Sequence, residues 1–292
     1  MVTPTKATAA PIKAPPFSIQ STTTKQRYLK LLIYGDFGVG KTFLAGTASD
    51  VNSMRDVLIL SAESGDQTLD VDGDDDKHRF SDIDVIDIKD YSTTGKVFDY
   101  LKLHCQLRED GDIERMAANE SRLKGKEIKP GKHKEYHTVI IDSLSEFDQY
   151  CLNQLLGITD ETRLDDEAST AEWAEYKKNS GMMRRFVRNF RDLPMNVIFI
   201  CGRNYVQDEM KRFNFLPSMT GKLSSHVQGF MDVVGYLVTD KVTEDGAEIP
   251  RKLYVQPVGK FAAKCRFTRF KGTNFENPTM TTILKSVGLL EA

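Results

Sequence analysis

Residues 35–42 read Gly-Asp-Phe-Gly-Val-Gly-Lys-Thr, and this stretch decides the fold. It matches the pattern G-x-x-x-x-G-K-[ST] at every fixed position. Residues 28–34 before it form a short apolar run of strand length, and residues 42–48 after it resemble the first turns of a helix. A glycine-rich loop between strand and helix lets backbone N–H groups curl around an anion at the positive end of the helix. The sequence therefore predicts a phosphate-binding loop.

The pattern also predicts what the loop residues do. Lys41 is expected to reach the β- and γ-phosphates of a nucleoside triphosphate, and the Thr42 hydroxyl to hold Mg²⁺. The alternative is a glycine-rich turn that matches by chance, and the flanking strand and helix argue against it. The residues expected to contact the nucleotide are Gly35, Asp36, Phe37, Gly38, Val39, Gly40, Lys41, Thr42 and Phe43.

The composition is that of an ordinary globular protein, with 40% hydrophobic and 28% charged residues in a chain of 292. Apolar runs such as residues 197–201 are far shorter than the roughly 20 residues that span a bilayer, so no membrane partner is expected. The four cysteines lie far apart without a C-x-x-C pair, which favours neither a zinc site nor a disulfide framework. A reducing, cytoplasmic setting is expected.

Charge is distributed unevenly although the net charge is only −2. Residues 63–90 hold eleven acidic side chains against three basic ones, and residues 251–271 hold seven basic side chains and no acidic one. Such a separation gives the protein one face that repels polyanions and one face that attracts them. The alternative is that both runs are merely solvated loops.

Strand-like and helix-like segments alternate from residue 28 onward, which predicts an α/β fold with a mainly parallel sheet flanked by helices. The predicted strands are 29–34, 57–62, 83–88, 137–142 and 195–201, and the predicted helices are 41–49, 93–107, 144–156 and 171–192. We expect a disordered arm at residues 1–18, because it is rich in proline and has no periodicity, and a single domain over residues 19–292. Within that domain, residues 108–136 are expected to form a charged surface insertion, and residues 230–270 a β-hairpin extension with a further strand at 260–268.

Two carboxylates follow predicted strands and are expected at the same edge of the sheet. Asp142 ends the apolar strand 137–142, where P-loop proteins place the carboxylate of the Mg²⁺ shell; a helix N-cap is the alternative. In many ring-forming ATPases a glutamate follows this aspartate as the base that activates water, but here the next residue is Ser143. Glu63, after the strand 57–62, is therefore the candidate base, with a structural turn carboxylate as the alternative.

These pieces together resemble the RecA-like ATPase core. The similarity rests on the phosphate loop, the strand ends S-A-E-S-G at 61–65 and I-I-D-S at 140–143, and the strand V-I-F-I at 197–200. More narrowly, the chain is similar over about residues 28–288 to phage-encoded RecA-like ATPases linked to single-strand annealing and recombination; further matching pieces are Trp173 to Tyr176, Leu216-Pro217, and Ala263 to Phe267. The resemblance implies a RecA-like P-loop NTPase core that uses ATP.

One departure concerns the γ-phosphate sensor. RecA has a polar residue at the end of the last of these strands, whereas this chain has Cys201 and Gly202, followed by Arg203 and Asn204. The resemblance leaves the sensor unassigned.

The resemblance implies a DNA-binding role for residues 203–229, because the loop after the sensor strand contacts single-stranded DNA in RecA-like proteins. Cations that track phosphates beside rings on which bases stack are what sequence-tolerant strand binding requires. The candidate residues are Arg203, Lys211, Arg212, Phe213, Phe215 and Lys222. The alternative is that the two phenylalanines pack in the core.

Lys264 and Arg266 share one face of a predicted strand, because side chains alternate along a strand. The resemblance, including a K-x-R-F element, implies that one of them acts catalytically on the γ-phosphate bound by the next subunit. Such a heterologous contact builds rings or helical filaments. The alternative is an ordinary basic strand face.

These features predict an ATP-binding and ATP-hydrolysing RecA-like protein that binds single-stranded DNA and promotes recombination or annealing. The resemblance implies a phage-encoded protein in the host cytoplasm, with ATP and Mg²⁺ as cofactors. Its expected partners are single-stranded DNA, further copies of the chain, and a single-strand DNA-binding protein. The alternatives are a helicase, helicase loader or packaging-type motor, and a nucleotide switch that does not hydrolyse.

Overall fold

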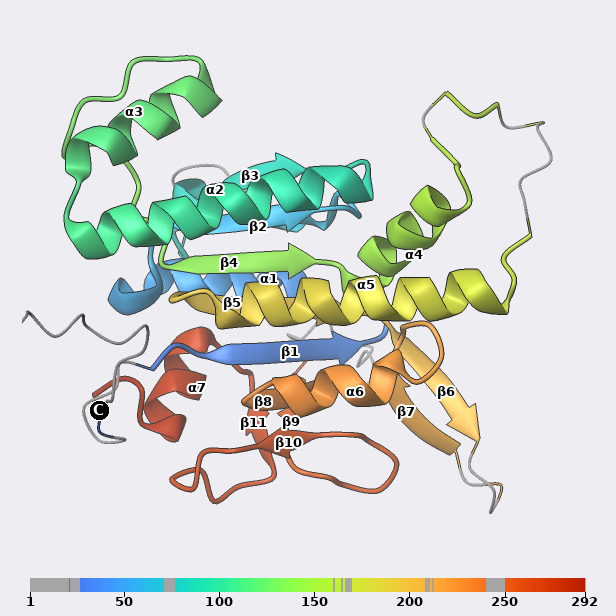
Figure 1. Ribbon diagram of the computed structural model, residues 1–292. Helices are drawn as coiled ribbons and strands as arrows, with labels where there is room; N and C mark the ends of the chain where they lie inside the picture. Colours follow the sequence, from blue (N-terminus) through green and yellow to red (C-terminus); the bar gives the residue numbers. More distant parts are fainter. Residues whose placement is uncertain are drawn as a thin grey trace, which may run out of the picture.

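The computed structural model is a mixed α/β fold in which helices cover both faces of a central sheet (Figure 1). It describes residue 21 and residues 27–70, 77–159, 161–163, 165, 170–207, 211, 213–239 and 250–291. The predicted disordered arm at residues 1–18 lies outside these described residues. The predicted fold class, a P-loop NTPase core with a mainly parallel sheet, is confirmed.

The strands of the central sheet are β1 (Lys30–Gly35), β2 (Val57–Ser61), β3 (Asp84–Asp87), β4 (Thr138–Asp142), β5 (Asn196–Cys201), β8 (Val233–Thr239), β9 (Arg251–Tyr254), β10 (Lys264–Cys265) and β11 (Asn274–Glu276). Their order is β11-β9-β8-β1-β5-β4-β2-β3, and β10 also pairs with β8. Strands β1 to β5 and β8 run parallel, whereas β9, β10 and β11 are antiparallel additions. A separate hairpin pairs β6 (Arg203–Gln207) with β7 (Phe213–Pro217).

The parallel strands end together at one edge of the sheet, here called the carboxyl edge. Ser61 of β2 lies opposite Asp142 of β4, and Gly35 of β1 lies opposite Leu237 of β8. Strand β9 runs the other way, so its first residue, Arg251, arrives at the same edge. The opposite edge, where β1 begins, is called the amino edge. This topology brings the phosphate loop and the chain after β2, β4 and β5 to one place, where ligands collect in open α/β sheets.

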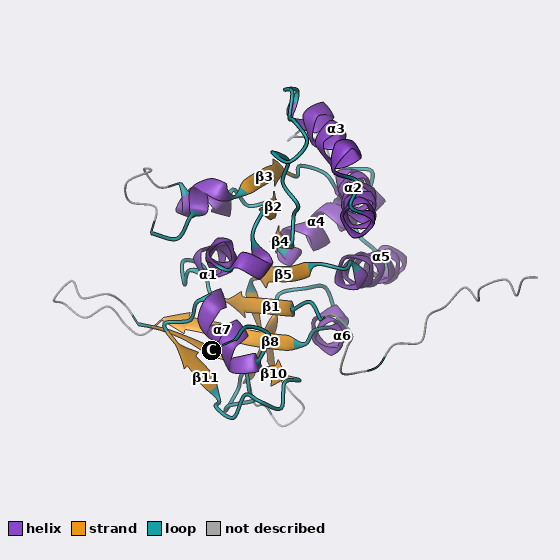
Figure 2. Cartoon of the chain, turned by 90° about the vertical axis from the view of Figure 1, so that its left-hand side faces the viewer, coloured by secondary structure: helices purple, strands orange, loops and turns teal. Residues whose placement is uncertain are grey.

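The helices are α1 (Lys41–Gly46), α2 (Tyr91–Asp110), α3 (Ile113–Lys124), α4 (Leu144–Leu155), α5 (Trp173–Asp192), α6 (Leu223–Phe230) and α7 (Met280–Val287). Figure 2 shows α2, α5 and α6 on one face of the sheet and α1 and α7 on the other. No described helix combines the length and the apolar character that a membrane crossing demands.

Alternating side chains of the strands supply two hydrophobic layers. Leu32 and Tyr34 of β1 join the cluster under α2, α4, α5 and α6, whereas Leu31 and Ile33 join the cluster under α1 and α7. Burial on both faces explains why these strands read as continuous apolar runs. Each fully buried side chain of this size contributes about 1.5–3 kcal/mol relative to an exposed one.

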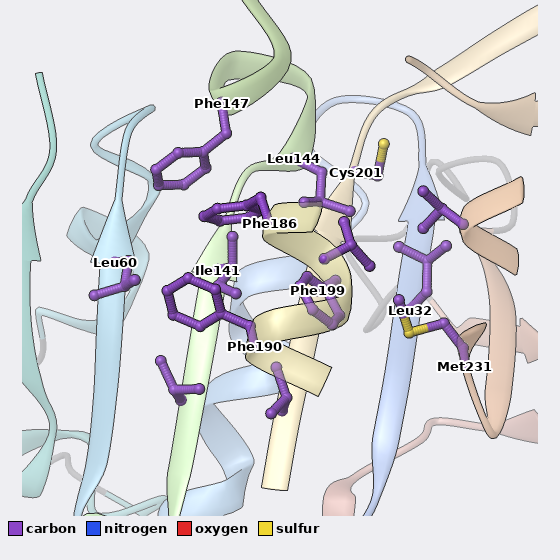
Figure 3. Close-up of a cluster of buried hydrophobic side chains, with 14 of the residues drawn as sticks. Leu32, Leu60, Ile141, Leu144, Phe147, Phe186, Phe190, Phe199, Cys201 and Met231 are labelled. Carbon is purple, nitrogen blue, oxygen red and sulfur yellow. The ribbon is translucent and has the colours of Figure 1, made fainter. Parts of the chain in front are cut away.

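Aromatic rings fill the layer between the sheet and α5 (Figure 3). Phe186 stacks on Phe147 of α4 with ring centroids 5.4 Å apart, and it contacts Phe190 at 4.7 Å. Helix α5 begins with a capping box between Glu172 and Glu175, which satisfies backbone N–H groups at its first turn. This packing holds α4 and α5 against each other.

The predicted strands and helices before residue 202 are confirmed, with ends shifted by a few residues. Helix α1 is shorter than predicted, because the chain tightens into a 3₁₀ turn at Thr47–Asp50. The charged segment 108–136 contains a helix, α3, that buries Met116 and Ala117.

The strand predicted at 260–268 is wrong over most of its length, since only Lys264–Cys265 pair with β8. The preceding residues bond β7 instead: the Phe215 N–H donates to the Lys260 carbonyl at 2.8 Å, and the Ala262 N–H donates to the Phe215 carbonyl at 3.3 Å. The segment therefore divides its backbone hydrogen bonds between two sheets.

Candidate active site

The phosphate loop connects β1 to α1 and depends on glycine at three positions. Gly38 and Gly40 have φ angles of +73° and +85°, which other residues rarely adopt. A Cβ on Gly35 would lie 2.4 Å from the Leu237 carbonyl oxygen, so β1 and β8 approach each other too closely for a side chain. Phe37 extends from the loop into solvent and is 87% exposed. The glycines of the sequence pattern are thus required by this backbone.

Lys41 lies over its own loop. Its Nζ donates to the Asp36 carbonyl at 2.7 Å and to the Gly35 carbonyl at 3.3 Å. Burial lowers the pKa of Lys41, while the nearby Glu63 and Asp142 carboxylates oppose that shift. The ammonium group therefore lies between the loop and the two carboxylates that were predicted from strand ends.

Thr42 and Asp142 face each other across a small gap. The Thr42 hydroxyl donates to Asp142 Oδ2 at 2.6 Å. A Cβ on Gly65 would lie 3.1 Å from Asp142 Oδ2 and 3.2 Å from Thr42 Oγ1, so this glycine keeps the space beside both oxygens clear. Burial raises the pKa of Asp142 to about 6, although the Thr42 hydrogen bond lowers it. A hydroxyl and a buried carboxylate oxygen around a cleared space fit a hard cation such as Mg²⁺.

Such a cation would need further ligands. The described residues contain no group of three or more His, Cys, Asp or Glu side chains that could hold a metal ion. Mg²⁺ is commonly bound by one or two carboxylates together with substrate phosphates and water. The donor set here fits that mode and not an all-protein cage.

Glu63 lies beside Asp142, as its position after β2 predicted. The Ser143 hydroxyl donates a hydrogen bond to Glu63 Oε1, although Ser143 is itself fully buried. Burial and the charge of Glu63 raise the pKa of Glu146, which places this third carboxyl nearby. The serine after Asp142 therefore orients the glutamate supplied by another strand.

Comparison with known families agrees with this geometry. A family model described as an AAA domain matches residues 27–267. The chain belongs to this AAA-domain family. The match indicates an AAA-type P-loop ATPase. No curated protein sequence matches the chain.

Arg203 of the AAA domain lies against the phosphate loop. Its Nε donates to Asp36 Oδ1 in an ion pair. Its guanidinium lies over the rings of Tyr205 and Phe215, at 4.5 and 4.9 Å from their centroids. Arg203 therefore connects the β6–β7 hairpin to the nucleotide loop, a link that its expected DNA contact did not anticipate.

Cys201 has the position of the RecA sensor but a different environment. It is fully buried, and its Sγ lies 3.4 Å from Ser145 Oγ. Burial raises the pKa of the thiol to about 12, so it stays neutral. Of the residues at this strand end, Arg203 is the one whose side chain reaches the loop.

The other predicted DNA residues follow β5 but differ in accessibility. Phe213 is 48% exposed, and Lys211 and Lys222 are exposed, whereas Phe215 is partly buried against Phe261 at a centroid distance of 5.4 Å. The alternative interpretation, core packing, thus applies to Phe215 but not to Phe213. Arg212 lies outside the described residues.

Lys264 and Arg266 lie at the amino edge, away from their own phosphate loop, since β10 pairs with the first half of β8. Lys264 Nζ donates to the Gln228 carbonyl at 2.8 Å, and Arg266 Nη2 donates to the Gly229 carbonyl at 2.7 Å. Arg266 also lies 3.5 Å from Asp232. Both side chains project toward the end of α6, as their alternate spacing predicted.

Arg251 was not predicted as a site residue from the sequence. A Cβ on Gly40 would lie 2.9 Å from Arg251 Nε, so the guanidinium contacts the glycine turn directly. It also lies over the ring of Phe43, 4.8 Å from the centroid. The only signal was that Arg251 opens the basic run 251–271.

Proposed function

We propose that this AAA domain hydrolyses Mg·ATP at the carboxyl edge and couples hydrolysis to single-stranded DNA bound by the β6–β7 hairpin. The observation that carries the proposal is the Arg203–Asp36 ion pair, which joins the hairpin to the phosphate loop. In this proposal one side chain, Arg203, serves both the ATP site and the DNA-binding hairpin.

In this proposal Lys41 binds the β- and γ-phosphates, and Thr42 and Asp142 hold Mg²⁺. The metal ion supplies neutralisation of charge on the phosphate oxygens. Glu63 accepts a proton from the water whose oxygen bonds to the γ-phosphorus, and the bond from that phosphorus to the bridging oxygen breaks, so ADP leaves with the electron pair. The Ser143 hydrogen bond supports this role because it fixes the Glu63 carboxylate beside the metal site.

The hairpin would bind single-stranded DNA through stacking and phosphate contacts. Tyr205 and Phe213 expose 54% and 48% of their surface. They share a face of the hairpin, because Tyr205 lies opposite Phe215 and Phe213 is two residues from Phe215 on the same strand. Lys211 lies exposed near the tip. Each stacked base would contribute about 1–3 kcal/mol. A DNA phosphate or a γ-phosphate that drew Arg203 away from Asp36 would change the contact between the hairpin and the phosphate loop. Binding of one ligand would then change the affinity for the other, and the effect would be reciprocal.

The proposed biological task is recombination or annealing by a ring or filament of a phage-encoded protein, in concert with a single-strand DNA-binding protein. Lys264 or Arg266 would act on the nucleotide of a neighbouring subunit. Their place at the edge opposite the phosphate loop supports head-to-tail assembly, because such a contact joins one subunit's amino edge to the next subunit's carboxyl edge.

The test compares ATP hydrolysis with and without a single-stranded oligonucleotide, at two salt concentrations. The proposal expects the oligonucleotide to raise the rate and added salt to weaken that effect, because DNA phosphates release counterions on binding. The double variant Tyr205→Ala/Phe213→Ala should keep the basal rate and lose most of the stimulation. An unchanged rate with DNA would contradict coupling. Faster pairing of complementary strands would support annealing, whereas directional unwinding of a forked duplex would favour the motor alternative.

A further inference from the structure

We infer that Arg251 is a nucleotide-binding residue that contacts the α-phosphate of bound ATP or ADP. The inference rests on nucleotide binding by the phosphate loop but not on DNA binding or hydrolysis. It begins from the position of the residue. Arg251 is the first residue of β9, and its antiparallel pairing with Thr239 of β8 brings it to the carboxyl edge beside the loop.

The backbone of Arg251 is held firmly. Its N–H donates to Asn277 Oδ1 at 3.0 Å, and its carbonyl accepts from the Asn277 N–H at 2.7 Å. The side chain then extends over Gly40, whose missing Cβ leaves room for the guanidinium. The guanidinium also lies over the Phe43 ring, which in turn contacts Phe80 at a centroid distance of 5.3 Å.

The guanidinium itself has no hydrogen-bond or ion-pair partner among the residues that the structure describes. Arg203, the other arginine at this loop, has its charge matched by Asp36. Arginine carries five N–H donors in a planar fork that matches phosphate oxygens. An arginine held over a phosphate loop with its donors unmatched by described groups is placed to bind a phosphate of the ligand.

The side of the loop on which Arg251 lies determines which phosphate it can contact. Lys41 Nζ, Thr42 and Asp142 lie on the side of the loop where the metal ion and the γ-phosphate are proposed. Arg251 lies over Gly40 and Phe43 instead. A contact on that side involves the α-phosphate, which ATP and ADP share. Arg251 should therefore strengthen the binding of both nucleotides equally and not distinguish them.

The experiment measures binding by calorimetry, using ADP and the non-hydrolysable analogue AMP-PNP with Mg²⁺. Arg251→Ala should weaken both ligands by a similar factor, roughly 10- to 100-fold, because a charge-assisted contact is lost. Arg251→Lys should lose less, since it keeps the charge but not the fork. Arg188→Ala is the matched control, because Arg188 also lies over a phenylalanine, Phe230, at 4.6 Å, but on α5 away from the loop; it should bind both nucleotides like the wild type.

A second variant separates the contact from folding. Phe43→Leu removes the ring under the guanidinium and should weaken both ligands by about 2- to 5-fold. In the Arg251→Ala background the same change should have little further effect, because the supported group is already gone. The thermal midpoint of the Arg251 variants without nucleotide should match the wild type.

Other results would overturn the inference. Loss of AMP-PNP affinity with ADP affinity unchanged would move the contact to the γ-phosphate. Unchanged affinity for both ligands would remove Arg251 from the site while leaving nucleotide binding intact. If the wild-type protein itself bound neither ligand, the inference and the proposed ATPase function would both fail.

Discussion

The carboxyl edge and the amino edge of the central sheet both gather cations, but they bond them differently. At the amino edge, Lys30 Nζ donates to the Leu193 and Met195 carbonyls at 2.8 and 2.5 Å. Lys264 and Arg266 likewise donate to carbonyls at the end of α6. Within one subunit, these cations are thus bound to backbone groups of other segments.

At the carboxyl edge the charged groups are bound to the phosphate loop or to hydroxyls. Lys41 donates to carbonyls of its own loop, and Arg203 pairs with Asp36 of that loop. Asp142 and Glu63 accept hydrogen bonds from the hydroxyls of Thr42 and Ser143, and neither carboxylate forms an ion pair with another described residue. Charge at this edge is therefore gathered around the phosphate loop, where the proposed function places the nucleotide and its metal ion.

The largest expected effect follows from Lys41→Ala. Loss of the ammonium group should reduce affinity for ADP and AMP-PNP by about 100-fold or more, because contacts to two phosphates disappear. Calorimetric titration measures this directly. Arg188→Ala is the matched control, because Arg188 lies over Phe230 at the end of α6, away from the phosphate loop. It should bind both nucleotides like the wild type; equal losses in the two variants would erase the distinction between the edges.

Glu63→Gln should retain nucleotide binding and lower turnover by about 10²–10⁴-fold, because the amide no longer accepts the proton of the attacking water. Steady-state phosphate release measures the rate, and calorimetry checks the binding. Glu146→Gln changes a neighbouring carboxyl and should stay close to the wild-type rate. The reverse pattern would assign the base to Glu146, and wild-type protein without any turnover would favour the nucleotide switch.

Arg266→Ala tests whether a cation of the amino edge also acts on a nucleotide, which the contrast between the two edges within one subunit does not show. If the residue acts on a neighbouring subunit's nucleotide, turnover of the assembled protein should fall by about 10²-fold. Mixing this variant with Glu63→Gln should then restore part of the activity, because some interfaces combine an intact arginine with an intact base. A variant that only unfolds at lower temperature, with unchanged turnover per folded molecule, would make Arg266 purely structural.

A smaller effect should appear in stability and should leave nucleotide affinity unchanged. His104 of α2 is buried toward the amino edge, 5.3 Å from the Tyr136 ring. Burial, assisted by the charge of Arg108, lowers the pKa of His104 to about 4. The unfolded chain takes up a proton near pH 6.5 and the folded chain does not, so stability is full above pH 6.5 and falls as pH drops toward 4, by at most about 3 kcal/mol.

Urea unfolding at several pH values measures this slope. His104→Met replaces the titrating ring with an apolar side chain, so the variant should lose less stability than the wild type between pH 6.5 and pH 4. Equal slopes for the two proteins would show that His104 is not the group responsible.

The sequence was sufficient to predict those elements that are determined by neighbouring residues. Strands such as β4 are buried on both faces, so their apolar runs are visible in the sequence, and the phosphate loop has a fixed glycine pattern. The approach of Asp142 and Glu63 to each other could be predicted because Asp142 ends one such strand, Glu63 follows another, and parallel strands end at the same edge. For the same reason the fold class and the meeting of these carboxylates could be predicted before their contacts were known.

The sequence was insufficient to predict contacts that depend on how strands distant in the sequence pair with one another. Arg203 and Asp36 are 167 residues apart, and nothing near either one indicates the pair. Arg251 reaches Gly40 only because β9 pairs antiparallel with β8 in one particular register. The strand predicted at 260–268 was wrong over most of its length because residues 260 and 262 form backbone hydrogen bonds with Phe215 of β7, which is distant in the sequence.

The most direct test of the central claim is a crystal structure with AMP-PNP and Mn²⁺, using anomalous scattering to locate the metal ion. The account predicts the triphosphate on the phosphate loop with Lys41 at its β- and γ-phosphates, and a manganese peak within coordinating distance of Thr42 Oγ1, with Asp142 in its shell. A nucleotide bound elsewhere, or a manganese peak remote from both Thr42 and Asp142, would contradict it.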